Sequence, residues 1–223
     1  MKEEICLSVV IPTLNAARTL ASAIAALGET KEIVVVDGGS TDDTVAVALA
    51  CGARTIAAAR GRGGQFAAGI AAATGDWLLL LHADTRLQPG WRAAAKALMT
   101  SGPAKAGFFH FNVLSDDPRA RRLERWVAWR CRVFALPYGD QGLLIHRDLL
   151  RAVGGMRPLP LMEDVDLVRR LGRSRLVGLD AVALTSAHKW HRDGWYRRSA
   201  RNLCCLALWF ARIPPRWIVR LYG

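Results

Sequence analysis

The stretch LSVVIPTLNAARTLASAIAALGETKEIVVVD, residues 7–37, decides the fold of this chain. It opens with a short β-branched run that Pro12 closes, and it ends with a second such run over residues 32–37. Short apolar runs of this kind indicate buried strands. Between them, apolar residues stand at helical spacing over residues 16–27, and Gly28 ends the pattern. A strand, a helix and a strand in so short a stretch predict a βαβ unit, whose two strands lie parallel in one sheet.

The alternation of strand and helix signals continues towards residue 100. The expected elements are a helix over residues 41–50, a short strand over 53–58, an Ala-rich helix over 65–74 and a buried strand over 76–81. Ser40 or Thr41 is the expected N-cap of the first of these helices, because short hydroxyl side chains satisfy free N–H groups there. The pattern predicts a parallel α/β sheet with helices on both faces.

The second half of the chain does not continue this alternation. Strands are expected over residues 106–113 and 142–146, with one or two more over 176–185; helices are expected over 118–134, 163–171 and 193–211, the last ending before Pro214-Pro215. No internal repeat or low-complexity linker divides the sequence. The prediction is one mixed α/β domain over residues 1–223 with an irregular second half.

The composition is that of a globular protein with a strong positive charge. The chain has 223 residues, 52% of them hydrophobic, which excludes an intrinsically disordered protein. Its formal net charge of +12 favours anionic partners such as phosphates or acidic lipid headgroups, although the excess of Arg over Lys can equally reflect a GC-rich coding sequence. No RNA- or DNA-binding motif accompanies the charge, so nucleic acid is not expected as a partner.

The two ends of the sequence bear on membrane contact. Met1-Lys-Glu-Glu4 leads directly into a strand-like run, which is not the pattern of a signal peptide. The uncharged apolar stretch over residues 203–211 is too short to span a bilayer. We therefore expect a cytoplasmic protein. Its basic end, with Trp195, Trp209 and Trp217, predicts peripheral contact with an anionic membrane at the inner face, and a terminal helix packed into the core is the alternative.

Polar residues follow three of the predicted parallel strands. The first strand runs into Pro12-Thr-Leu-Asn15, the second ends at Asp37, and the fourth is followed by His82-Ala-Asp84. In open parallel sheets, ligands bind outside the carboxyl ends of the strands. A turn or helix cap explains each segment taken alone, but their occurrence at successive strand ends favours a ligand site.

The residue types suit a nucleotide and a metal. A carboxylate at Asp37 can accept hydrogen bonds from a ribose or a base. The short acidic, imidazole-bearing segment ending at Asp84 suits a hard divalent ion, which keeps open positions for diphosphate oxygens when one carboxylate holds it.

Two further polar segments are candidates for the same site. Arg60-Gly-Arg-Gly-Gly-Gln65 precedes a predicted helix, where glycines allow close backbone approach and arginines attract anions; a flexible basic turn is an equal alternative. Met162-Glu-Asp-Val-Asp166 opens another predicted helix, where carboxylates often serve only as dipole partners. The preceding loop, residues 154–160, is long enough to carry that cluster towards the pocket.

In combination, these segments resemble the family 2 glycosyltransferases. Ser8-Val-Val-Ile-Pro-Thr-Leu-Asn15, Val35-Val-Asp-Gly-Gly-Ser-Thr-Asp-Asp-Thr44, His82-Ala-Asp84 and Met162-Glu-Asp-Val-Asp166 fall in the order and spacing of that family, over roughly residues 5–180. Tyr138-Gly-Asp-Gln-Gly142 and Pro158-Leu-Pro-Leu-Met-Glu-Asp164 resemble a small bacterial subgroup of transferases of unknown substrate.

The resemblance implies a GT-A fold, with a Rossmann-like, mostly parallel sheet. It implies an inverting, metal-dependent transferase that moves a sugar from a nucleotide-sugar donor, UDP- or GDP-linked, to an acceptor hydroxyl. Residues 1–100 would form the nucleotide-binding half, 101–190 the acceptor and catalytic half, and 191–223 a C-terminal helical segment that touches the membrane or packs into the core.

The resemblance also implies roles by position. Asp84 matches the last Asp of the family's DXD motif and would bind Mn²⁺ or Mg²⁺; His82 replaces the usual Asp there, which leaves metal preference open. Asp164 matches the Asp of the ED motif and would be the catalytic base. The resemblance places Pro12, Thr13, Asn15 and Asp37 at the nucleotide. Together with His82 and Asp84, and with Arg60, Arg62 and Gln65 of the basic loop described above, they make up the expected donor site. Acceptor-side candidates are Asp140, Gln141, Glu163, His188, Lys189 and Trp190.

The chemistry agrees with these roles, and two alternatives stay open. Direct displacement at an anomeric carbon needs a base for the incoming hydroxyl and charge neutralisation on the departing diphosphate. A non-catalytic nucleotide-sugar-binding or membrane-associated scaffold would not need Asp164. A nucleotidyltransferase would be expected to carry a Gly-rich basic loop directly after the first strand, and Pro12-Thr-Leu-Asn15 is not such a loop.

Overall fold

The computed structural model of the protein describes residues 6–222. Residues 1–5, on which the signal-peptide prediction rests, and residue 223 lie outside the described residues. The first half alternates strands and helices in the order β1 (Leu7–Thr13), α1 (Ala17–Ala25), β2 (Glu32–Asp37), α2 (Thr44–Ala50), β3 (Arg54–Ala57), α3 (Arg62–Ala72) and β4 (Trp77–Leu80). The predicted strand–helix alternation of this half is confirmed.

The second half is less regular, as predicted. Its elements are β5 (Thr85–Leu87), α4 (Trp91–Thr100), β6 (Ala106–Leu114), α5 (Pro118–Phe134), β7 (Leu143–His146), α6 (Arg147–Ala152), α7 (Glu163–Leu171), β8 (Leu176–Ser186), α8 (His188–Asp193), α9 (Trp195–Phe210) and α10 (Pro215–Tyr222). Short 3-10 turns cover Gly139–Gln141 and Arg173–Arg175. The bounds of α5 and α7 agree with the sequence prediction to the residue.

Among the described residues the strands form one eight-stranded sheet in the order β3-β2-β1-β4-β7-β6-β8-β5. The pairs from β3 to β4 are parallel, whereas β7 runs antiparallel to both β4 and β6. In the register between β1 and β2, Thr13 stands opposite Asp37. The last residues of these two strands are therefore level at the same edge of the sheet, where the sequence predicts the nucleotide.

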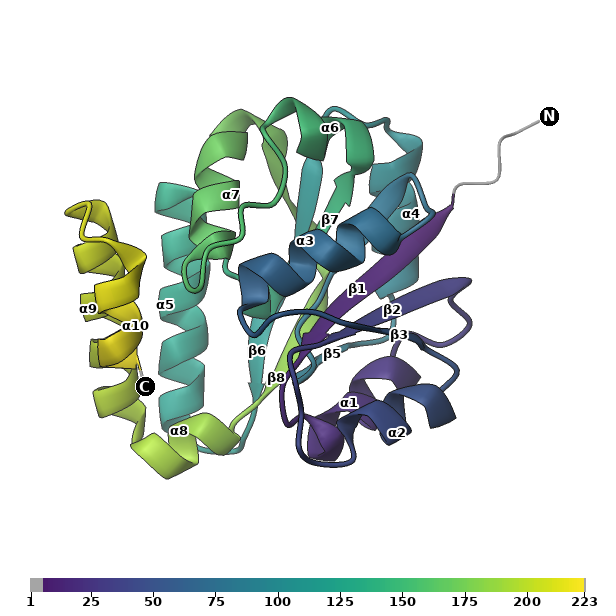
Figure 1. The fold of residues 1–223 in the computed structure, drawn as a ribbon. Coiled ribbons are helices and arrows are strands. Elements are labelled where there is room, and N and C mark those ends of the chain that lie inside the picture. The colour runs from purple at the N-terminus through teal and green to yellow at the C-terminus, as the bar shows by residue number, and fades with distance from the viewer. Residues whose placement is uncertain (1–5, 223) are drawn as a thin grey trace.

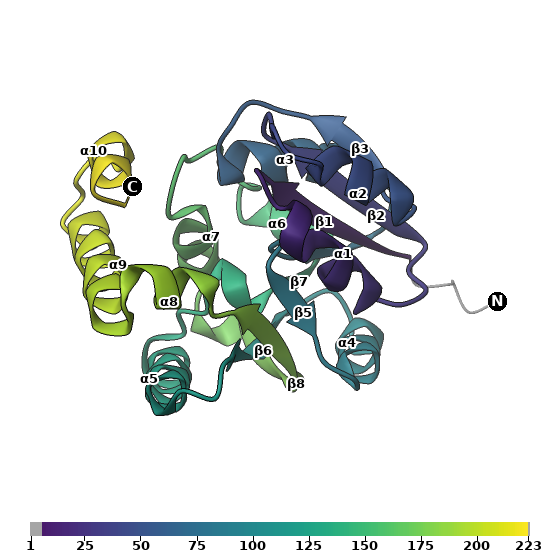
Figure 2. The ribbon, with the colours of Figure 1, turned by 90° about the horizontal axis from the view of Figure 1, so that it is seen from below.

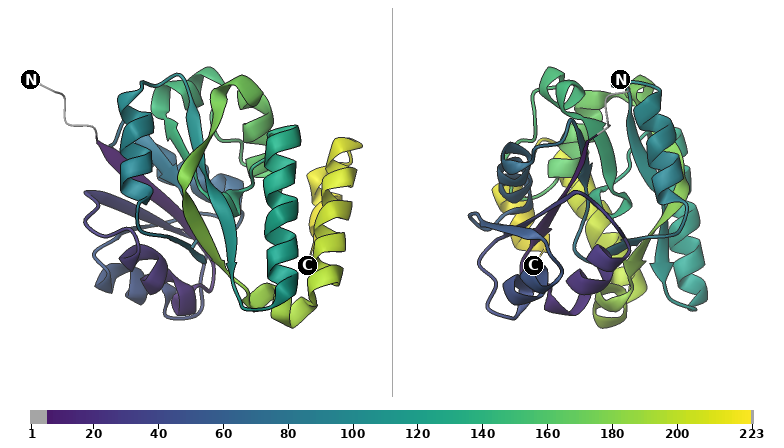
Figure 3. Two further views of the ribbon diagram at one scale, coloured as in Figure 1. Left: turned by 180° about the vertical axis from the view of Figure 1, so that it is seen from behind. Right: turned by 90° about the vertical axis from the view of Figure 1, so that its right-hand side faces the viewer.

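Helices cover both faces of the sheet, as predicted (Figures 1 and 3). Successive side chains of a strand point to opposite faces. Accordingly, Val9 and Ile11 of β1 pack in a core with α1, α2 and α4, whereas Val10 packs with α3, α6 and α7. Each face buries its own apolar cluster, so β1 is apolar on both faces from Val9 to Pro12.

Two predicted helix starts are wrong, for reasons that concern the site. The predicted helix over residues 41–50 begins only at Thr44. Asp43 is at its N-cap position, and the Thr44 N–H donates to the Asp42 carboxylate (3.1 Å). The hydroxyls of Ser40 and Thr41 instead donate to Asp37 and Asn15. Helix α3 begins at Arg62 rather than at residue 65.

The predicted C-terminal helix over residues 193–211 is in fact divided. Gly194, with φ of 82°, ends α8 and precedes α9. A further helix, α10, follows, with Pro215 as its first residue, a position where the missing proline N–H costs nothing. Figure 2 shows α9 and α10 side by side at the edge of the molecule, and Cys205 and Ile218 from them pack with Val165 of α7. None of the helices within residues 6–222 has the length and apolar character needed to cross a membrane.

Candidate functional site

Asp37, the last residue of β2, is buried at the edge of the sheet. Its Oδ1 accepts hydrogen bonds from the hydroxyls of Thr13 (3.1 Å) and Ser40 (2.5 Å), and its Oδ2 accepts from the N–H groups of Gly39 (3.0 Å) and Ser40 (2.9 Å). Burial opposes ionisation, but these hydrogen bonds outweigh it and lower the pKa of Asp37. The charged carboxylate thus organises the loop that follows β2.

Asn15 links the loop after β1 to the same loop. Its side-chain oxygen accepts from the N–H of Thr41 (2.8 Å), and its own N–H donates to the Ser40 hydroxyl (2.9 Å). Asn15 has φ of 51° and is exposed; asparagine is one of the few residues that tolerate this left-handed conformation. The two loops therefore form one polar rim above β1 and β2.

Gln65 and Pro12 support this rim from below. The Gln65 side chain is buried and donates from Nε2 to the carbonyls of Thr13 and Val36, at 2.8 Å each. A Cβ at Gly38 would lie 2.9 Å from the same amide, so glycine allows this close packing. Pro12 is buried within β1. Of the predicted donor residues, Gln65 and Pro12 are therefore part of the framework beneath the polar rim.

The arginines of the predicted basic loop separate. Arg60 is exposed before α3. Arg62, in the first turn of α3, lies with its Nε 2.9 Å from Oε1 of the buried Glu163. Gly63 is required beside it, because a Cβ there would lie 2.5 Å from the carbonyl oxygens of Arg157 and Leu159. The loop before α7 is thereby held against the start of α3.

His82 and Asp84 follow β4 and face other charged groups. Burial, together with the nearby Arg62, lowers the pKa of His82 to about 4, so its ring is neutral at pH 7. Its Nε2 is buried without a hydrogen-bond partner among the described residues. Burial opposes ionisation of Asp84, yet Lys189 and His82 lower its pKa, and the Lys189 ammonium donates to Asp84 Oδ2 at 2.8 Å.

Gly139 brings the segment around His82 to the acidic cluster at α7. The Gly139 N–H donates to Asp164 Oδ2 at 2.7 Å. A Cβ on Gly139 would lie 2.5 Å from His82 Nε2 and 3.3 Å from Asp164 Oδ2. Gly139 therefore packs closely against both side chains, and any larger residue at this position would have to displace His82.

Two more carboxyl groups of this region hold their protons more tightly than usual. Burial raises the pKa of Asp140 to about 6 and that of Glu163 to about 7; the negative charge of Asp164 adds to both shifts, while neighbouring arginines oppose them. Asp164 is less buried than Glu163 and lines a small cavity with Tyr138 and Gly139. Glu163 lines the same cavity, but Asp164 is the more exposed carboxylate of the ED pair.

The raised pKa of Glu163 gives a prediction for stability. A carboxyl group whose pKa is higher in the folded state stabilises the fold fully below its unfolded pKa, near 4.5, and loses that contribution as the pH rises through about 7. Between these pH values, the free energy of unfolding of the wild type should fall by about 1 kcal/mol or more relative to that of Glu163→Gln. Urea unfolding of both proteins at several pH values measures this, and a difference that does not change with pH would contradict the assignment.

The other acceptor-side candidates differ in their surroundings, and most of them do not face the site. Gln141 is buried, donating to the Phe109 carbonyl (3.0 Å) and accepting from the Tyr138 N–H (3.2 Å). Trp190 is buried and stacks on Trp195, with ring centroids 6.1 Å apart, whereas His188 is exposed. Of the predicted Lys189-Trp190 pair, the lysine reaches the site and the tryptophan packs in the core.

Sequence reasoning missed three features of the site. These are the Gly139 turn, the Lys189–Asp84 ion pair and the Arg130 guanidinium, which lies 3.4 Å from the centre of the Tyr138 ring. The segment Tyr138-Gly-Asp-Gln-Gly142 carries the signal for the first, since two glycines flank its polar residues. Nothing in the sequence indicates the other two pairings.

The residues present offer a divalent metal two side-chain ligands at most. Within residues 6–222, no three His, Cys, Asp or Glu side chains gather into a metal-binding group. Asp84 has a carboxylate and His82 a neutral ring nitrogen that lacks a partner. One or two carboxylates with the remaining positions left to substrate phosphates is the usual arrangement for Mg²⁺. Asp84 supplies one such carboxylate, and the His82 imidazole is a ligand type more typical of transition metals.

Comparison with known proteins identifies the family. The model of glycosyl transferase family 2 matches residues 8–157. An uncharacterized glycosyltransferase of Mycobacterium tuberculosis is 37% identical over 84 residues, which cover 37% of this chain and 38% of that protein. The succinoglycan biosynthesis protein ExoO of Rhizobium meliloti is 33% identical over 180 residues, 76% of this chain and 51% of ExoO. The chain thus matches only about half, or less, of the length of these relatives.

Solved structures share the fold. Glucosyl-3-phosphoglycerate synthase from Mycobacterium tuberculosis, in complex with Mn²⁺, UDP and glucosyl-3-phosphoglycerate, superposes with a TM-score of 0.57 at 23% identity, over 83% of this chain and 71% of that one. TarS of S. aureus gives a TM-score of 0.63 at 15% identity, over 91% of this chain and 39% of that one. Because the family model matches most of the chain, the chain belongs to glycosyl transferase family 2.

Proposed function

We propose that the protein is a metal-dependent inverting glycosyltransferase that moves a sugar from a nucleotide-sugar donor to an acceptor hydroxyl, with Asp164 as general base. The observation that carries this proposal is the Gly139 turn, whose N–H donates to Asp164 and whose Cα lies so close to His82 that a Cβ would clash with the ring. The donor-side and base motifs of the family, far apart in sequence, are thereby neighbours in one site.

Three groups of residues hold the donor in this proposal. Asp37 and Asn15 meet the nucleoside at the rim above β1 and β2. Asp84, with His82, holds Mn²⁺ or Mg²⁺, which when bound neutralises charge on the leaving diphosphate. Arg62 and the exposed Arg60 add positive charge beside it. A UDP- or GDP-linked sugar is the proposed donor; the Mn²⁺ and UDP bound by glucosyl-3-phosphoglycerate synthase support the first.

Asp164 is the residue best suited to take the acceptor proton. Its carboxylate lines a cavity, and the Gly139 N–H fixes the orientation of one oxygen. A carboxylate oxygen keeps further lone pairs for an incoming hydroxyl. Asp140, with a raised pKa, contacts the acceptor or positions Asp164, and the fully buried Glu163 positions Asp164.

Lys189 has a role at Asp84 in this proposal. In the protein without donor, its ammonium neutralises the Asp84 carboxylate at 2.8 Å. For Asp84 to hold a divalent ion, the ammonium would have to move aside. The Lys189 side chain is 51% exposed, so this movement disturbs no packed core, and the freed ammonium is then available to the donor phosphates or the acceptor.

Hydrolysis of the donor tests the proposal while the acceptor is unidentified. Water replaces the acceptor slowly in such enzymes, so release of UDP from UDP-glucose, or of GDP from GDP-mannose, should be detectable with Mn²⁺ or Mg²⁺ and cease with EDTA. Binding of a nucleotide sugar without any turnover, with and without candidate acceptors, would favour the alternative of a non-catalytic scaffold.

We also propose that the enzyme is cytoplasmic and touches the anionic inner face of the membrane through its C-terminal helices. Residues 195–222 contain no Asp or Glu and carry six arginines, three before residue 202 and three after residue 211. Trp195 is buried in the core, but Trp217 on α10 is 51% exposed and Leu203 on α9 is 64% exposed. Exposed apolar side chains among arginines suit an interfacial helix. The division into nucleotide-binding, catalytic and C-terminal segments proposed from the sequence fits this role.

Co-sedimentation with anionic liposomes tests the membrane proposal. The wild type should pellet with phosphatidylglycerol vesicles at low salt and less at high salt, since screening weakens surface attraction. The double variant Arg216→Gln, Arg220→Gln on α10 should bind several-fold less. Arg18→Gln with Lys96→Gln, both exposed and on α1 and α4, removes the same charge and should bind as the wild type. Absence of binding at both salt concentrations leaves only the core-packing role for these helices.

A further inference from the structure

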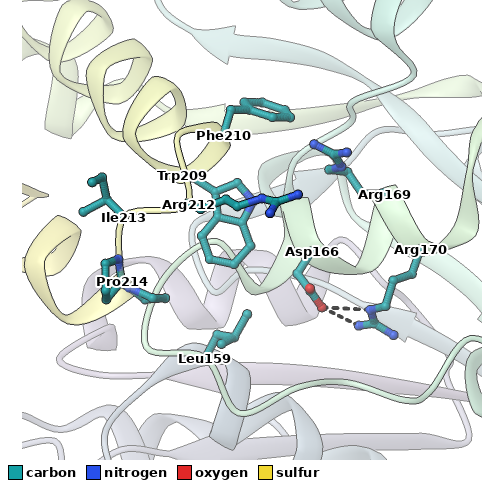
Figure 4. A pocket seen from close by; sticks show the side chains of 10 residues that line it. Leu159, Asp166, Arg169, Arg170, Trp209, Phe210, Arg212, Ile213 and Pro214 are labelled. Carbon is teal, nitrogen blue, oxygen red and sulfur yellow. Dashed lines mark hydrogen bonds and ion pairs between the residues drawn. The ribbon is translucent and has the colours of Figure 1, made fainter.

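A second cavity lies between α7 and the α9–α10 turn, away from the donor site. Its volume is about 690 Å³, within the range of small-molecule sites. Asp166, Arg169 and Arg170 of α7 line one side, and Trp209, Phe210 and Arg212 line the other (Figure 4). Residues Asp164 and Asp166 are about 200° apart around α7, so this cavity and the proposed base lie on different faces of the helix.

The cavity has an excess of positive charge. Its one carboxylate, Asp166, is compensated twice, by Arg170 (Nε at 2.8 Å) and by Arg157 (Nη1 at 3.0 Å). The other two guanidinium groups, those of Arg169 and Arg212, have no carboxylate partner within residues 6–222. Arg169 lies over the Phe210 ring at 4.8 Å, and Arg212 makes no side-chain hydrogen bond or ion pair within residues 6–222. Both extend into the space between the helices (Figure 4).

The backbone at Arg212 makes arginine an unexpected residue there. Its φ is 61°, and the turn closes α9 with hydrogen bonds from Arg212 N–H to the Trp209 carbonyl (2.9 Å) and from Ile213 N–H to the Leu208 carbonyl (3.0 Å). Helices usually end in this way with glycine, which adopts positive φ without steric cost. Arginine is therefore unfavourable for the turn itself, and its side chain supplies the one feature that glycine lacks, a guanidinium over the cavity.

We propose that this cavity binds a phosphate ester whose organic part is apolar. A guanidinium donates two parallel hydrogen bonds to phosphate oxygens, and two guanidiniums match the charge of a phosphomonoester. The indole of Trp209 and the side chains of Ile213 and Pro214 offer an apolar wall for the attached group. A lipid headgroup and a free phosphate ester share this chemistry. The site requires neither Asp84 nor a metal, so it stands independently of the proposed transfer reaction.

Calorimetric titration with phenyl phosphate tests the proposal. The buffer contains EDTA, which prevents metal-dependent binding at the donor site. The wild type should bind, and Arg212→Gly and Arg169→Gln should each lose at least about tenfold in affinity, the usual scale for one charge-assisted pair. Arg197→Gln, an exposed residue at the start of α9 and outside the cavity, removes the same charge and should bind as the wild type.

The choice of variants separates binding from folding. Glycine fits the positive φ of residue 212, so the melting temperature of Arg212→Gly should equal or exceed that of the wild type. Arg169→Gln changes an exposed residue on a different helix. Absence of phenyl phosphate binding by the wild type, or equal binding by both cavity variants, would overturn the proposal.

Vesicles identify the source of the phosphate. Phosphatidylcholine vesicles with and without phosphatidic acid are compared by co-sedimentation, again in EDTA. Binding that requires phosphatidic acid and is lost in Arg212→Gly, but not in Arg18→Gln on α1, outside the proposed membrane-contacting segment, supports the site with a lipid headgroup as its ligand. If Arg212→Gly binds vesicles as the wild type does but loses phenyl phosphate binding, the result supports the site with a free phosphate ester as its ligand.

Discussion

Replacing Asp164 by Asn is expected to lower the rate of sugar transfer by about 100-fold or more, the usual scale for losing a positioned base. The amide keeps the size of the carboxylate and can still accept from the Gly139 N–H, but it cannot take a proton at neutral pH. Donor affinity should remain close to that of the wild type. Steady-state kinetics with saturating donor measures the first effect, and calorimetric titration with the nucleoside diphosphate measures the second.

Glu163→Gln is the matched control for this variant. Glu163 is fully buried, with Arg62 at 2.9 Å, and at helical spacing its side chain diverges from that of Asp164 by about 100°. We expect Glu163→Gln to retain far more activity than Asp164→Asn. If Asp164→Asn transferred sugar at the wild-type rate while Glu163→Gln did not, the base would be Glu163. If both were fully active, the proposed mechanism would fail.

The second large effect is expected at Asp84. Asp84→Ala should abolish metal-dependent nucleotide binding, because it removes the carboxylate proposed to hold the cation between protein and diphosphate. The fold should survive, since the partner that loses its ion pair, Lys189, has an exposed side chain that water can solvate. Circular dichroism and calorimetry with and without EDTA measure fold and binding.

Asp180→Ala is a suitable control for the Asp84 variant. Asp180 is an exposed carboxylate on β8, and its removal should leave nucleotide affinity and its metal dependence unchanged. Unchanged affinity in Asp84→Ala, or wild-type binding that EDTA does not weaken, would mean that Asp84 holds no cation for the donor.

The elements that could be predicted are those fixed by local periodicity. Strand β2 and helices α5 and α7 have the predicted bounds, because apolar spacing, a capping Asp117 or a terminal Gly172 marks each of them. Helix α4 was not predicted, although Trp91, Ala95 and Leu98, which it buries, stand at helical spacing. The break between α8 and α9 depends on the positive φ at Gly194, which a helical pattern does not reveal.

The site was predictable where it follows strand ends and not where distant segments meet. Asp37 and His82-Ala-Asp84 follow buried strands, so topology alone brings them to one edge of the sheet. The Lys189–Asp84 pair joins residues 105 positions apart, and the Gly139–Asp164 hydrogen bond joins residues 25 apart. Such pairings depend on how β7, β8 and α7 pack. The same applies to Gln65, whose amide binds the ends of β1 and β2 from beneath.

The most direct test of the central claim is a thermal-shift panel of UDP-, GDP- and dTDP-sugars with Mn²⁺, with Mg²⁺ and with EDTA. A ligand that binds only the folded protein raises its stability by about 2.7 kcal/mol at 100 times its dissociation constant. We predict that UDP- or GDP-sugars raise the melting temperature with a divalent metal, that EDTA removes the effect, and that Asp84→Ala does not show it. A panel in which no nucleotide sugar stabilises the wild type in the presence of either metal would contradict the account.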